Sequence, residues 1–521
     1  MVTDLKGTNV EHGAALMKAD AARLEISPLL DPARRAKLGQ FLTPAIVAEF
    51  MARMVLPLPM SVRLLDAGAG AGSLTAAFVK EVSSRSRRPG SLEVSAFEID
   101  SSLHGHLEQT LNACSLECHA AGMQFISRVI HQDFVENAAT LFDSQRVRAE
   151  YDCALLNPPY AKIGSTSTTR YALRQLGVET SNLYSAFVAV ALSQLKTGGQ
   201  LIAITPRSFC NGPYFGSFRK FILRHAGLVR AHVYLSRKTA FGEDDVLQEN
   251  IIYHLVKGIP QPSTVRISSS LGPRDTDPVE HEVPFTEVVL PNDPHKFIRL
   301  VSSAEDSQLA QRVRGLPCSL AGLGLKVSTG RVVDFRAREH LRDDPMEGAV
   351  PLIYPCHFEQ GFVKWPQSGC RKPNALALSG QTMPLTVPKG SYVLTKRFSS
   401  KEERRRIVAA VYDPRRIDAA LVGFENHLNY FHREGSGLRP ALAKGLALYL
   451  NSTAVDQYFR QFSGHTQVNA TDLRALHYPS IDQLEAIGRI MDGVLPSQRS
   501  IDEAVEELLP TTCPAGTGRS I

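Results

Sequence analysis

Short apolar runs alternate with helical patterns along residues 31–257, and this alternation constrains the fold most strongly. Such runs stand at residues 62–67, 92–98 and 151–156. Strands that alternate with helices predict βαβ units and a mainly parallel, Rossmann-like sheet of the α/β class. Open sheets of this kind bind ligands at the carboxyl ends of their strands. The residues that follow each run are therefore the first candidates for a functional site.

The run at residues 151–156 leads directly into Asn157-Pro158-Pro159-Tyr160. A proline cannot donate a backbone hydrogen bond, and it keeps the residue before it out of the α region, so a strand is expected to end at Leu156 in a rigid turn. The Asn157 side-chain oxygen and the Pro158 carbonyl could accept both protons of a planar amino group, which would free the nitrogen lone pair to attack an electrophile. Tyr160 could stack on the ring that carries this amino group. For these four residues alone, a plain strand-ending turn is the alternative.

Three alternating glycines, Gly68, Gly70 and Gly72, follow the run at residues 62–67 and precede a helical pattern. Glycine permits a positive φ and a close approach of the backbone to a ligand, and the start of a helix offers free N–H groups. The spacing differs from the G-x-G-x-x-G of dinucleotide enzymes and from the phosphate loop with Gly-Lys-Ser/Thr. It suits a small zwitterionic amino-acid group better than a pyrophosphate. A small-residue loop that packs a helix on a sheet is the alternative.

Carboxylates end two further runs. Glu98 stands where α/β nucleotide folds bind ribose hydroxyls. Asp133 could accept a hydrogen bond from an adenine amino group, with Phe134 beside it to pack against the ring. A single carboxylate after a strand is usually a solvated turn. Four strand ends that carry, in order, the glycine loop, Glu98, Asp133 and the Asn-Pro-Pro-Tyr turn favour one cofactor site.

This order of motifs resembles that of S-adenosylmethionine-dependent amino-methyltransferases, and more closely that of the gamma-class adenine-N6 DNA methyltransferases. Residues 37–44 are similar to the Gly-Gln-Phe-x-Thr-Pro motif of this class, which closes over the methionine end of the cofactor. Residues 182–187 and 195–206 match its next helix and strand. The segment 239–241 falls where the family places a second aromatic residue against a flipped base, which implies that role for Phe241.

The resemblance covers residues 35–256 and implies S-adenosylmethionine as the cofactor. It implies a site-specific DNA methyltransferase that modifies the N6 amino group of an adenine flipped out of a short duplex sequence. The catalytic residues would be Asn157, Pro158, Pro159 and Tyr160, with Tyr160 and Phe241 stacking on the base. The cofactor-binding residues would be Gln40, Phe41, Thr43, Asp66, Gly68, Gly70, Gly72, Glu98, Asp133, Phe134 and Asn157.

A chain of 521 residues is too long for one compact core, so two domains are expected. Proline- and glycine-rich turns at residues 259–263, 272–278 and 291–294 indicate an irregular connector with a few edge strands. The expected parts are a helical extension over residues 1–30, the methyltransferase domain over 31–257, the connector over 258–315, an α+β DNA target-recognition domain over 316–495 and a tail over 496–521.

Two polar segments of the second domain predict contact with duplex DNA. Basic side chains crowd residues 396–406, and residues 461–474 concentrate Gln, Asn, His, Thr and Arg around one glycine. Such side chains bind phosphate oxygens or read base edges, although a solvated helix and a capped loop are the blander alternatives. Residues 327–330 and 464–473 resemble recurring parts of the target-recognition domains of type II adenine methyltransferases related to the Eco57I group, which usually act beside a separate restriction nuclease. The predicted DNA-binding residues are Lys396, Arg397, Arg404, Arg405, His465, Gln467 and Asn469.

The bulk composition is that of an ordinary globular protein, and a cytoplasmic location is expected. Charged residues make up 21% and apolar residues 43% of the chain, the net charge is +6, and no apolar run approaches the length that spans a bilayer. The eight cysteines form neither a disulfide framework nor the paired spacing of a zinc site. Free thiols and no metal are therefore expected, with Cys356 and Cys370 included among the thiols.

Several other functions remain as alternatives. RNA and protein-glutamine methyltransferases share the Asn-Pro-Pro-Tyr turn but generally lack a large basic C-terminal domain. Amino-cytosine methylation usually accompanies a Ser-Pro-Pro-Tyr-like turn, and cytosine C5 methylation needs a cysteine nucleophile, whereas both Pro-Cys pairs lie far outside the catalytic half. A non-catalytic DNA-binding specificity protein on the same fold is an alternative of a different class.

Overall fold

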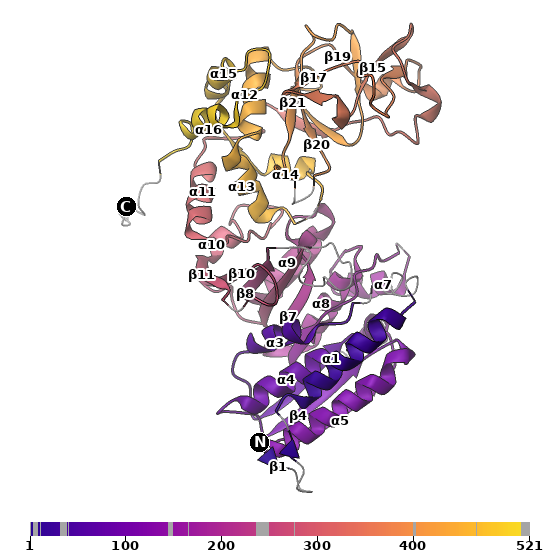
Figure 1. The fold of residues 1–521 in the computed structure, drawn as a ribbon, viewed down its shortest axis with the longest axis vertical. Helices are drawn as coiled ribbons and strands as arrows, with labels where there is room; N and C mark the ends of the chain where they lie inside the picture. The colour runs from indigo at the N-terminus through magenta and orange to yellow at the C-terminus, as the bar shows by residue number, and fades with distance from the viewer. Residues whose placement is uncertain are drawn as a thin grey trace. The chain divides into compact units, whose positions relative to one another are not determined.

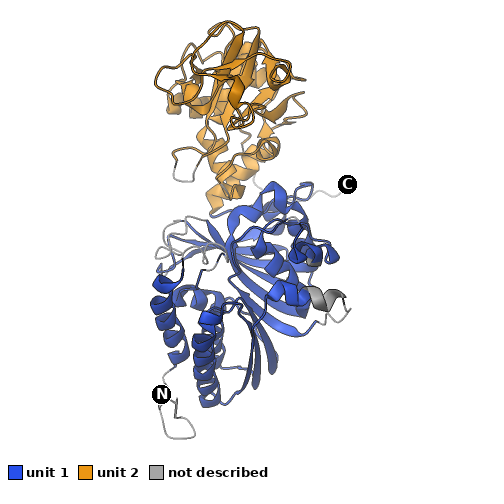
Figure 2. Ribbon diagram, turned by 90° about the vertical axis from the view of Figure 1, so that its right-hand side faces the viewer, with its two compact units in different colours: residues 1–302 blue, residues 303–521 orange. Residues whose placement is uncertain are grey.

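The computed structural model describes residues 2–3, 9–10, 12–31, 39, 41–143, 149–164, 166–235, 249–275, 277–399, 403–464 and 466–511. Contacts within the chain divide it into two compact units, Met1–Ser302 (unit 1) and Ser303–Ile521 (unit 2), which follow one another along the colour gradient of Figure 1 and are coloured separately in Figure 2. Each unit has hydrophobic cores of its own.

Unit 1 is built on a nine-stranded sheet in the order β11-β10-β8-β9-β7-β6-β3-β4-β5. The strands from β7 to β5 in this order are parallel, as are β8 and β10, whereas β9 and β11 run antiparallel to their neighbours. The expected Rossmann-like, mainly parallel α/β sheet is therefore confirmed. Its strands are β3 (Ser61–Ala67), β4 (Ser91–Phe97), β5 (Gln124–Ile130), β6 (Tyr151–Leu156), β7 (Leu195–Pro206), β8 (Ala226–Tyr234), β9 (Asn250–Lys257), β10 (Thr264–Ser270) and β11 (Val279–Pro284).

Helices cover both faces of this sheet (Figure 1). Successive residues of a strand point to opposite faces, so Val62 and Leu64 of β3 enter one core while Leu65 and Ala67 enter the other. The first core is completed by α1 (Ala14–Ile26), α3 (Ala45–Arg53), α4 (Ser73–Ser84) and α5 (His104–Ala120). The second is completed by α6 (Phe134–Asp143), α7 (Thr168–Gln175), α8 (Leu183–Gln194) and α9 (Gly216–His225).

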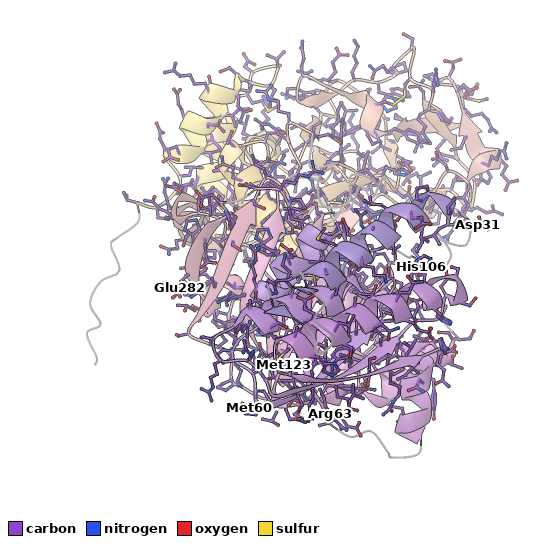
Figure 3. The ribbon with its side chains drawn as sticks, turned by 60° about the horizontal axis from the view of Figure 1, so that its bottom comes forward. Asp31, Met60, Arg63, His106, Met123 and Glu282 are labelled. Carbon is purple, nitrogen blue, oxygen red and sulfur yellow. A yellow bond between two sulfur atoms is a disulfide. The ribbon has the colours of Figure 1, made fainter. Side chains whose placement is uncertain are left out.

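The two ends of the parallel strands differ in character. Met60 and Met123 precede β3 and β5 at the amino edge of the sheet, where Figure 3 shows both beside Arg63. The carboxyl edge carries the glycine loop (residues 68–72), Glu98 and the Asn-Pro-Pro-Tyr turn (residues 157–160). The residues predicted to bear chemistry thus lie at one edge.

Three segments outside the expected domains form regular elements. Helix α1 lies in the expected N-terminal extension and packs into unit 1, and β10 and β11 lie in the expected connector but extend the sheet. Residues Gln498–Glu506 of the expected tail form α16, which buries Ile501 and Val505 on one helical face. The division between the units falls after Ser302, inside the segment read as a connector.

Unit 2 combines small sheets with helices, as expected for an α+β domain. One sheet has the order β13-β23-β20-β21-β17-β16, another β14-β18-β15-β22-β19, and β12 pairs with β24. The strands are β12 (Cys318–Ser319), β13 (Lys326–Thr329), β14 (Leu341–Arg342), β15 (Ala349–Ile353), β16 (Phe358–Glu359), β17 (Phe362–Val363), β18 (Ala375–Ala377), β19 (Thr386–Pro388), β20 (Tyr392–Lys396), β21 (Ala409–Tyr412), β22 (Leu421–Phe424), β23 (Leu428–His432) and β24 (His477–Tyr478). The main helices are α11 (Ala304–Arg314), α12 (Pro440–Leu450), α13 (Thr453–Phe462), α14 (Ala470–Arg474), α15 (Ile481–Gly488) and α16.

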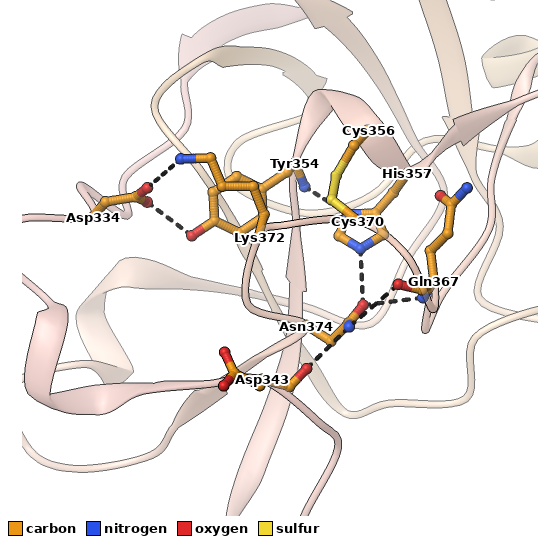
Figure 4. Close-up of a disulfide and its surroundings, with 9 residues drawn as sticks. All are labelled: Asp334, Asp343, Tyr354, Cys356, His357, Gln367, Cys370, Lys372 and Asn374. Carbon is orange, nitrogen blue, oxygen red and sulfur yellow. Dashed lines mark hydrogen bonds and ion pairs between the residues drawn. A yellow bond between two sulfur atoms is a disulfide. The ribbon is translucent and has the colours of Figure 1, made fainter.

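Cys356 and Cys370 form a disulfide, so the expectation of free thiols at these two positions was wrong. The chain turns back through the β16–β17 hairpin, which brings residue 370 within 6.4 Å of residue 356 between Cα atoms, and spacing in the sequence does not reveal such a return. Figure 4 shows the bridge beside His357, whose Nε2 lies 3.0 Å from the Asn374 side-chain oxygen. Within the described part of the chain, the free cysteines are Cys114, Cys118, Cys153, Cys210 and Cys318.

Candidate active site and nucleic-acid-binding surface

A cavity in unit 1 opens at the carboxyl edge of the sheet. The chain proceeds from β3 to β4 and β5 in one direction along the sheet and from β6 to β7 in the other, so the order reverses between β3 and β6. Open α/β sheets bind ligands at such a switch point. The predicted site residues that line the cavity are Phe41, Thr43, Gly68, Gly70, Glu98, Asp133, Phe134, Asn157 and Pro159.

The glycine loop is folded tightly against Phe41–Thr43 and β4. The N–H groups of Gly68 and Ala69 both donate to the Phe97 carbonyl at 2.9 Å. Gly70 has a φ of +57°, and a Cβ there would lie 2.8 Å from the Leu42 side chain. A residue with a side chain would therefore force the loop and its neighbour apart.

Asp66 and Gly72 do not line the cavity, although both were expected to bind the cofactor. The Asp66 side chain turns beneath the loop and accepts a hydrogen bond from the Thr75 hydroxyl at 2.6 Å, and burial raises its pKa to about 6. Gly72 precedes α4 with a φ of +87°, and a Cβ there would meet Thr110 of α5 at 2.9 Å. Both residues shape the loop from behind.

Glu98 is buried at the cavity wall and holds the loop in place. One carboxylate oxygen accepts a hydrogen bond from the Gly70 N–H at 2.8 Å, and the other accepts one from the Asp100 N–H at 2.7 Å. Burial raises the pKa of Glu98. Each carboxylate oxygen has a further lone pair for a ligand hydroxyl.

Asp133 and Phe134 form the adjoining wall. Asp133 Oδ1 accepts hydrogen bonds from the Val135 and Glu136 N–H groups, both at 2.8 Å, at the start of α6. The Phe134 ring lies 5.1 Å from Phe97 and 5.4 Å from Phe187 between centroids. These rings give the cavity an apolar side of aromatic edges and faces.

Asn157 and Pro159 of the Asn-Pro-Pro-Tyr turn line the cavity, whereas Pro158 and Tyr160, which were also predicted to be catalytic, do not. The Asn157 side-chain nitrogen donates to the Phe41 carbonyl at 2.8 Å and to the Thr43 hydroxyl oxygen at 3.0 Å. The Asn157 side-chain oxygen accepts a hydrogen bond from the Tyr160 hydroxyl at 3.2 Å. The Tyr160 ring lies 5.6 Å from Phe41 and 6.3 Å from Tyr184 between centroids. Burial raises the pKa of Tyr160 well above its ordinary value.

Sequence reasoning missed about half of the cavity wall. Most of the missed positions stand next to a predicted residue in the sequence, so adjacency to a strand end could have found them, whereas Leu183 and Phe187 come from α8 and carry no such signal. Gln40, Phe241 and His465, which were also predicted site residues, lie outside the described residues. The missed lining residues are Leu42, Ala69, Ala71, Ser73, Phe97, Ile99, Gln132, Leu183 and Phe187.

In unit 2, the two predicted DNA-binding segments lie side by side. The Ser399 N–H donates to the Thr466 carbonyl at 3.0 Å, and the Val468 N–H donates to the Arg397 carbonyl at 2.7 Å. These bonds align Lys396 and Arg397 with Gln467 and Asn469, which lie some 70 residues further along the chain.

A third predicted segment, residues 327–330, joins the same region through Asn429 of β23. The Asn429 side-chain nitrogen donates to the Val468 carbonyl at 2.8 Å, and its side-chain oxygen accepts a hydrogen bond from the Thr329 hydroxyl at 3.3 Å. Asn429 itself is buried. Residues 327–330 and 466–469 therefore meet at one buried amide, and residues 396–399 join them through Val468.

The predicted contact residues of this region differ in exposure. Arg404 is exposed, whereas Lys396, Arg397, Arg405, Gln467 and Asn469 are half-buried. Asn469 also caps α14, in a reciprocal arrangement with Asp472. Arg406, part of the basic cluster, is buried, and its Nε–H donates to the Ser399 hydroxyl at 3.2 Å, so it supports the fold. We call residues 396–399, 404–405 and 466–469 the basic surface.

The switch-point cavity, with the glycine loop on one wall and the Asn-Pro-Pro-Tyr turn on another, defines a Rossmann-like methyltransferase. Residues 101–241 match the model of the Eco57I restriction-modification methylase family. The chain is 46% identical over 490 residues to the type II methyltransferase M.PstI of Providencia stuartii, which covers 94% of this chain and 96% of that protein. It is 43% identical over 502 residues to the type II methyltransferase M.BsuBI of Bacillus subtilis, at 95% and 98% coverage. The chain belongs to the type II methyltransferase family of restriction-modification systems.

Likeness to solved structures is lower. The DrdV–DNA complex determined by cryo-electron microscopy matches with a TM-score of 0.48 and 13% identity, over 92% of this chain and 60% of that chain. The type IIG restriction endonuclease BpuSI matches with a TM-score of 0.42 and 12% identity, over 90% of this chain and 62% of that chain. The protein thus spans less than two thirds of either of these longer chains, and its family membership rests on the sequence relatives.

Proposed function

We propose that the protein is a site-specific DNA methyltransferase that transfers a methyl group from S-adenosylmethionine to the N6 amino group of an adenine flipped out of a short duplex sequence. One observation carries this proposal. The Asn157 side-chain oxygen lies in a proline-stiffened turn that shares its cavity with the glycine loop and Glu98. An acceptor for an amino group thus stands beside a site of suitable shape for a nucleoside cofactor.

The residues around the cavity fit S-adenosylmethionine. Glu98 can accept hydrogen bonds from ribose hydroxyls while it holds the Gly70 and Asp100 amides. Asp133 can accept from the purine amino group, and the ring system can pack against Phe134. The glycine loop can let its backbone approach the amino-acid end closely, because its glycines carry no side chain. When bound, the cofactor supplies an electrophilic methyl group on a positively charged sulfur.

The protein's own residues would then prepare the nitrogen nucleophile. The target base must leave the helical stack to bring its amino group into the cavity. The Asn157 side-chain oxygen and the Pro158 carbonyl would accept its two N–H protons, and Tyr160 would stack on the ring. Positioning in line with the methyl group supplies most of the acceleration. The raised pKa of Tyr160 keeps its phenol protonated, so its role is to orient the base and the Asn157 amide. The surplus proton of the methylated amino group passes to solvent.

Unit 2 would supply contact with DNA through the basic surface. Its arginines and lysine can bind phosphates, and Gln467 and Asn469 offer amide groups of the kind that read base edges. The type II and restriction-modification names of its relatives and family support a cognate restriction nuclease as the functional partner, on a separate chain. None of the described helices is both long and apolar enough to cross a membrane. We place the activity in the cytoplasm, where such a nuclease and its DNA would meet.

The test is expression in a bacterium that lacks adenine and cytosine methylation, followed by sequencing that detects modified bases. We expect N6-methyladenine at one short motif. Modified cytosine, or methyl transfer to RNA or protein glutamine with unmodified DNA, would overturn the adenine assignment. Failure of the purified protein to bind S-adenosylhomocysteine by calorimetry would identify a non-catalytic specificity protein instead.

A further inference from the structure

Gly39 and residues 41–43 lie directly against the Asn-Pro-Pro-Tyr turn. The Tyr160 N–H donates to the Gly39 carbonyl at 3.0 Å, and the Phe41 and Tyr160 rings are 5.6 Å apart. A Cβ on Gly39 would lie only 2.6 Å from the Tyr160 backbone nitrogen. A segment far upstream in the sequence thus forms the outer support of the turn.

The same segment determines which way the Asn157 amide faces. The Phe41 carbonyl oxygen can only accept a hydrogen bond, so the group that meets it at 2.8 Å must be the amide nitrogen. The Thr43 hydroxyl oxygen accepts the second N–H at 3.0 Å. A reversed amide would set two oxygens against each other at Phe41 and leave buried polar atoms unpaired, because Asn157 and Thr43 are only 8% and 7% exposed.

With its nitrogen held in this way, Asn157 presents its oxygen on the side of Tyr160. This orientation matters because an amino group approaching the turn offers N–H donors. The oxygen attracts such a donor, whereas a reversed amide would present its own N–H groups and repel it. The Phe41 carbonyl therefore selects an acceptor for the site before any substrate arrives, and the Thr43 hydroxyl, which accepts the second N–H, holds the amide in that orientation.

We propose that Thr43 is a positioning residue for methyl transfer, since its hydroxyl, with the Phe41 carbonyl, keeps the Asn157 oxygen turned toward the target amino group. The inference rests on the proposed function. It assigns the Thr43 hydroxyl to Asn157, whereas sequence resemblance assigned Thr43 to the cofactor. Both assignments are compatible with the cavity wall, so they must be separated by measurement.

Thr43→Val removes the hydroxyl and keeps the branched shape, and Thr43→Ser restores the hydroxyl. Thr110→Val is the matched control, because Thr110 is also a buried threonine but lies in α5 and does not line the cavity. Two quantities are measured: affinity for S-adenosylhomocysteine by calorimetry, and the single-turnover rate of tritiated methyl transfer at saturating S-adenosylmethionine. The DNA probe is genomic DNA from the methylation-deficient host.

For Thr43→Val we expect a transfer rate about 10- to 100-fold below wild type, with the S-adenosylhomocysteine affinity within about threefold. Thr43→Ser should return the rate to within about fivefold of wild type, and Thr110→Val should match wild type. A wild-type rate for Thr43→Val, a loss of rate that equals the loss of affinity, or no recovery with serine would each overturn the inference. If Thr43→Val does not fold, Thr43→Ala is judged by the same two quantities.

Failure of the proposed function gives a different result. If wild type itself transfers no methyl group to DNA, the proposed substrate is wrong. If wild type and Thr110→Val transfer normally and Thr43→Val does so as well, only the role of Thr43 is wrong.

Discussion

Asn157 engages both its side-chain nitrogen and its side-chain oxygen before a substrate is bound. Asn157→Ala removes the oxygen that would accept an N–H of the target base but leaves the Pro158 carbonyl. We expect DNA methylation to fall by at least about 100-fold, with S-adenosylhomocysteine affinity largely intact. Base-modification sequencing and calorimetry measure the two effects. Asn292→Ala, at an exposed position, is the control, and retained methylation in Asn157→Ala would remove Asn157 from the mechanism.

Asp66 predicts a pH dependence of stability. Its pKa of about 6 in the folded protein lies above the value of about 3.9 for an unfolded aspartate. The folded state therefore binds the proton more tightly, and the stability that this gives is present at low pH and is lost as pH rises from about 4 through 6. Between about pH 5 and pH 8 we expect wild type to lose about 1 to 2 kcal/mol of unfolding free energy relative to Asp66→Asn. Denaturant unfolding at a series of pH values measures this loss. Parallel curves of unfolding free energy against pH for wild type and Asp66→Asn would contradict the prediction.

Strand-end reasoning placed Glu98, Asp133, Phe134 and Asn157 at the cavity because the carboxyl ends of parallel strands meet at one edge. The same reasoning was wrong to place Asp66 at the cavity, because its side chain turns toward Thr75 of α4. It lies beneath a loop whose path depends on three positive φ angles. Such a path is set by tertiary contacts. It could not be read from the residue types alone.

At the scale of elements, the contact between Gly39 and the Asn-Pro-Pro-Tyr turn leads to a prediction. Gly39→Ala would add a Cβ 2.6 Å from the Tyr160 backbone nitrogen, at a φ of +61°. We expect it to displace the turn and to reduce the methyl-transfer rate by about 100-fold. Gly177→Ala is a matched control, because Gly177 has a φ of +72° but no atom within 4 Å of the added Cβ.

Comparison of these two variants separates backbone strain from contact. Both should lose roughly 1 kcal/mol of stability from the left-handed backbone conformation. Only Gly39→Ala should lose the methyl-transfer rate, which the tritium assay measures. Equal rates in the two variants would show that the contact at Gly39 does not support the turn.

The elements themselves were partly predictable. The apolar runs and the proline turn located β3, β4 and β6 closely. The direction of β9 was not predictable, since an apolar run reads the same for a parallel and an antiparallel strand. Edge strands were expected in the connector, but the turn residues at 259–263 and 272–278 gave no sign that β10 and β11 extend the sheet of unit 1.

At the scale of the whole molecule, the basic surface predicts salt-dependent DNA binding by unit 2. Arg404→Ala removes an exposed positive charge from this surface. We expect the slope of log affinity against log salt to flatten by about 1, with weaker binding to every duplex tested. Fluorescence anisotropy with a labelled duplex measures the slope. Arg499→Ala, on the exposed face of α16, is the control, and an equal effect there would place the DNA contact elsewhere.

Chain length and composition were sufficient to predict two folding units, and the division after Ser302 falls within the expected connector. The convergence of residues 327–330, 396–399 and 466–469 was beyond such reasoning. Each segment looked merely polar by itself, and the buried Asn429 that joins two of them carries no local signal. The Cys356–Cys370 bridge was hidden for the same reason, because it depends on a chain reversal.

Phe41 and Thr43 both line the cavity and accept hydrogen bonds from the Asn157 amide, and this has a consequence for inhibition. A drug-like compound lodged in the cavity could shift the wall formed by these residues, and the wall is bonded to the Asn157 amide. Such a compound would compete with the methyl donor and also misalign the acceptor of the target base. A resistance mutation that only tightens binding of the methyl donor would then leave the acceptor of the target base misaligned.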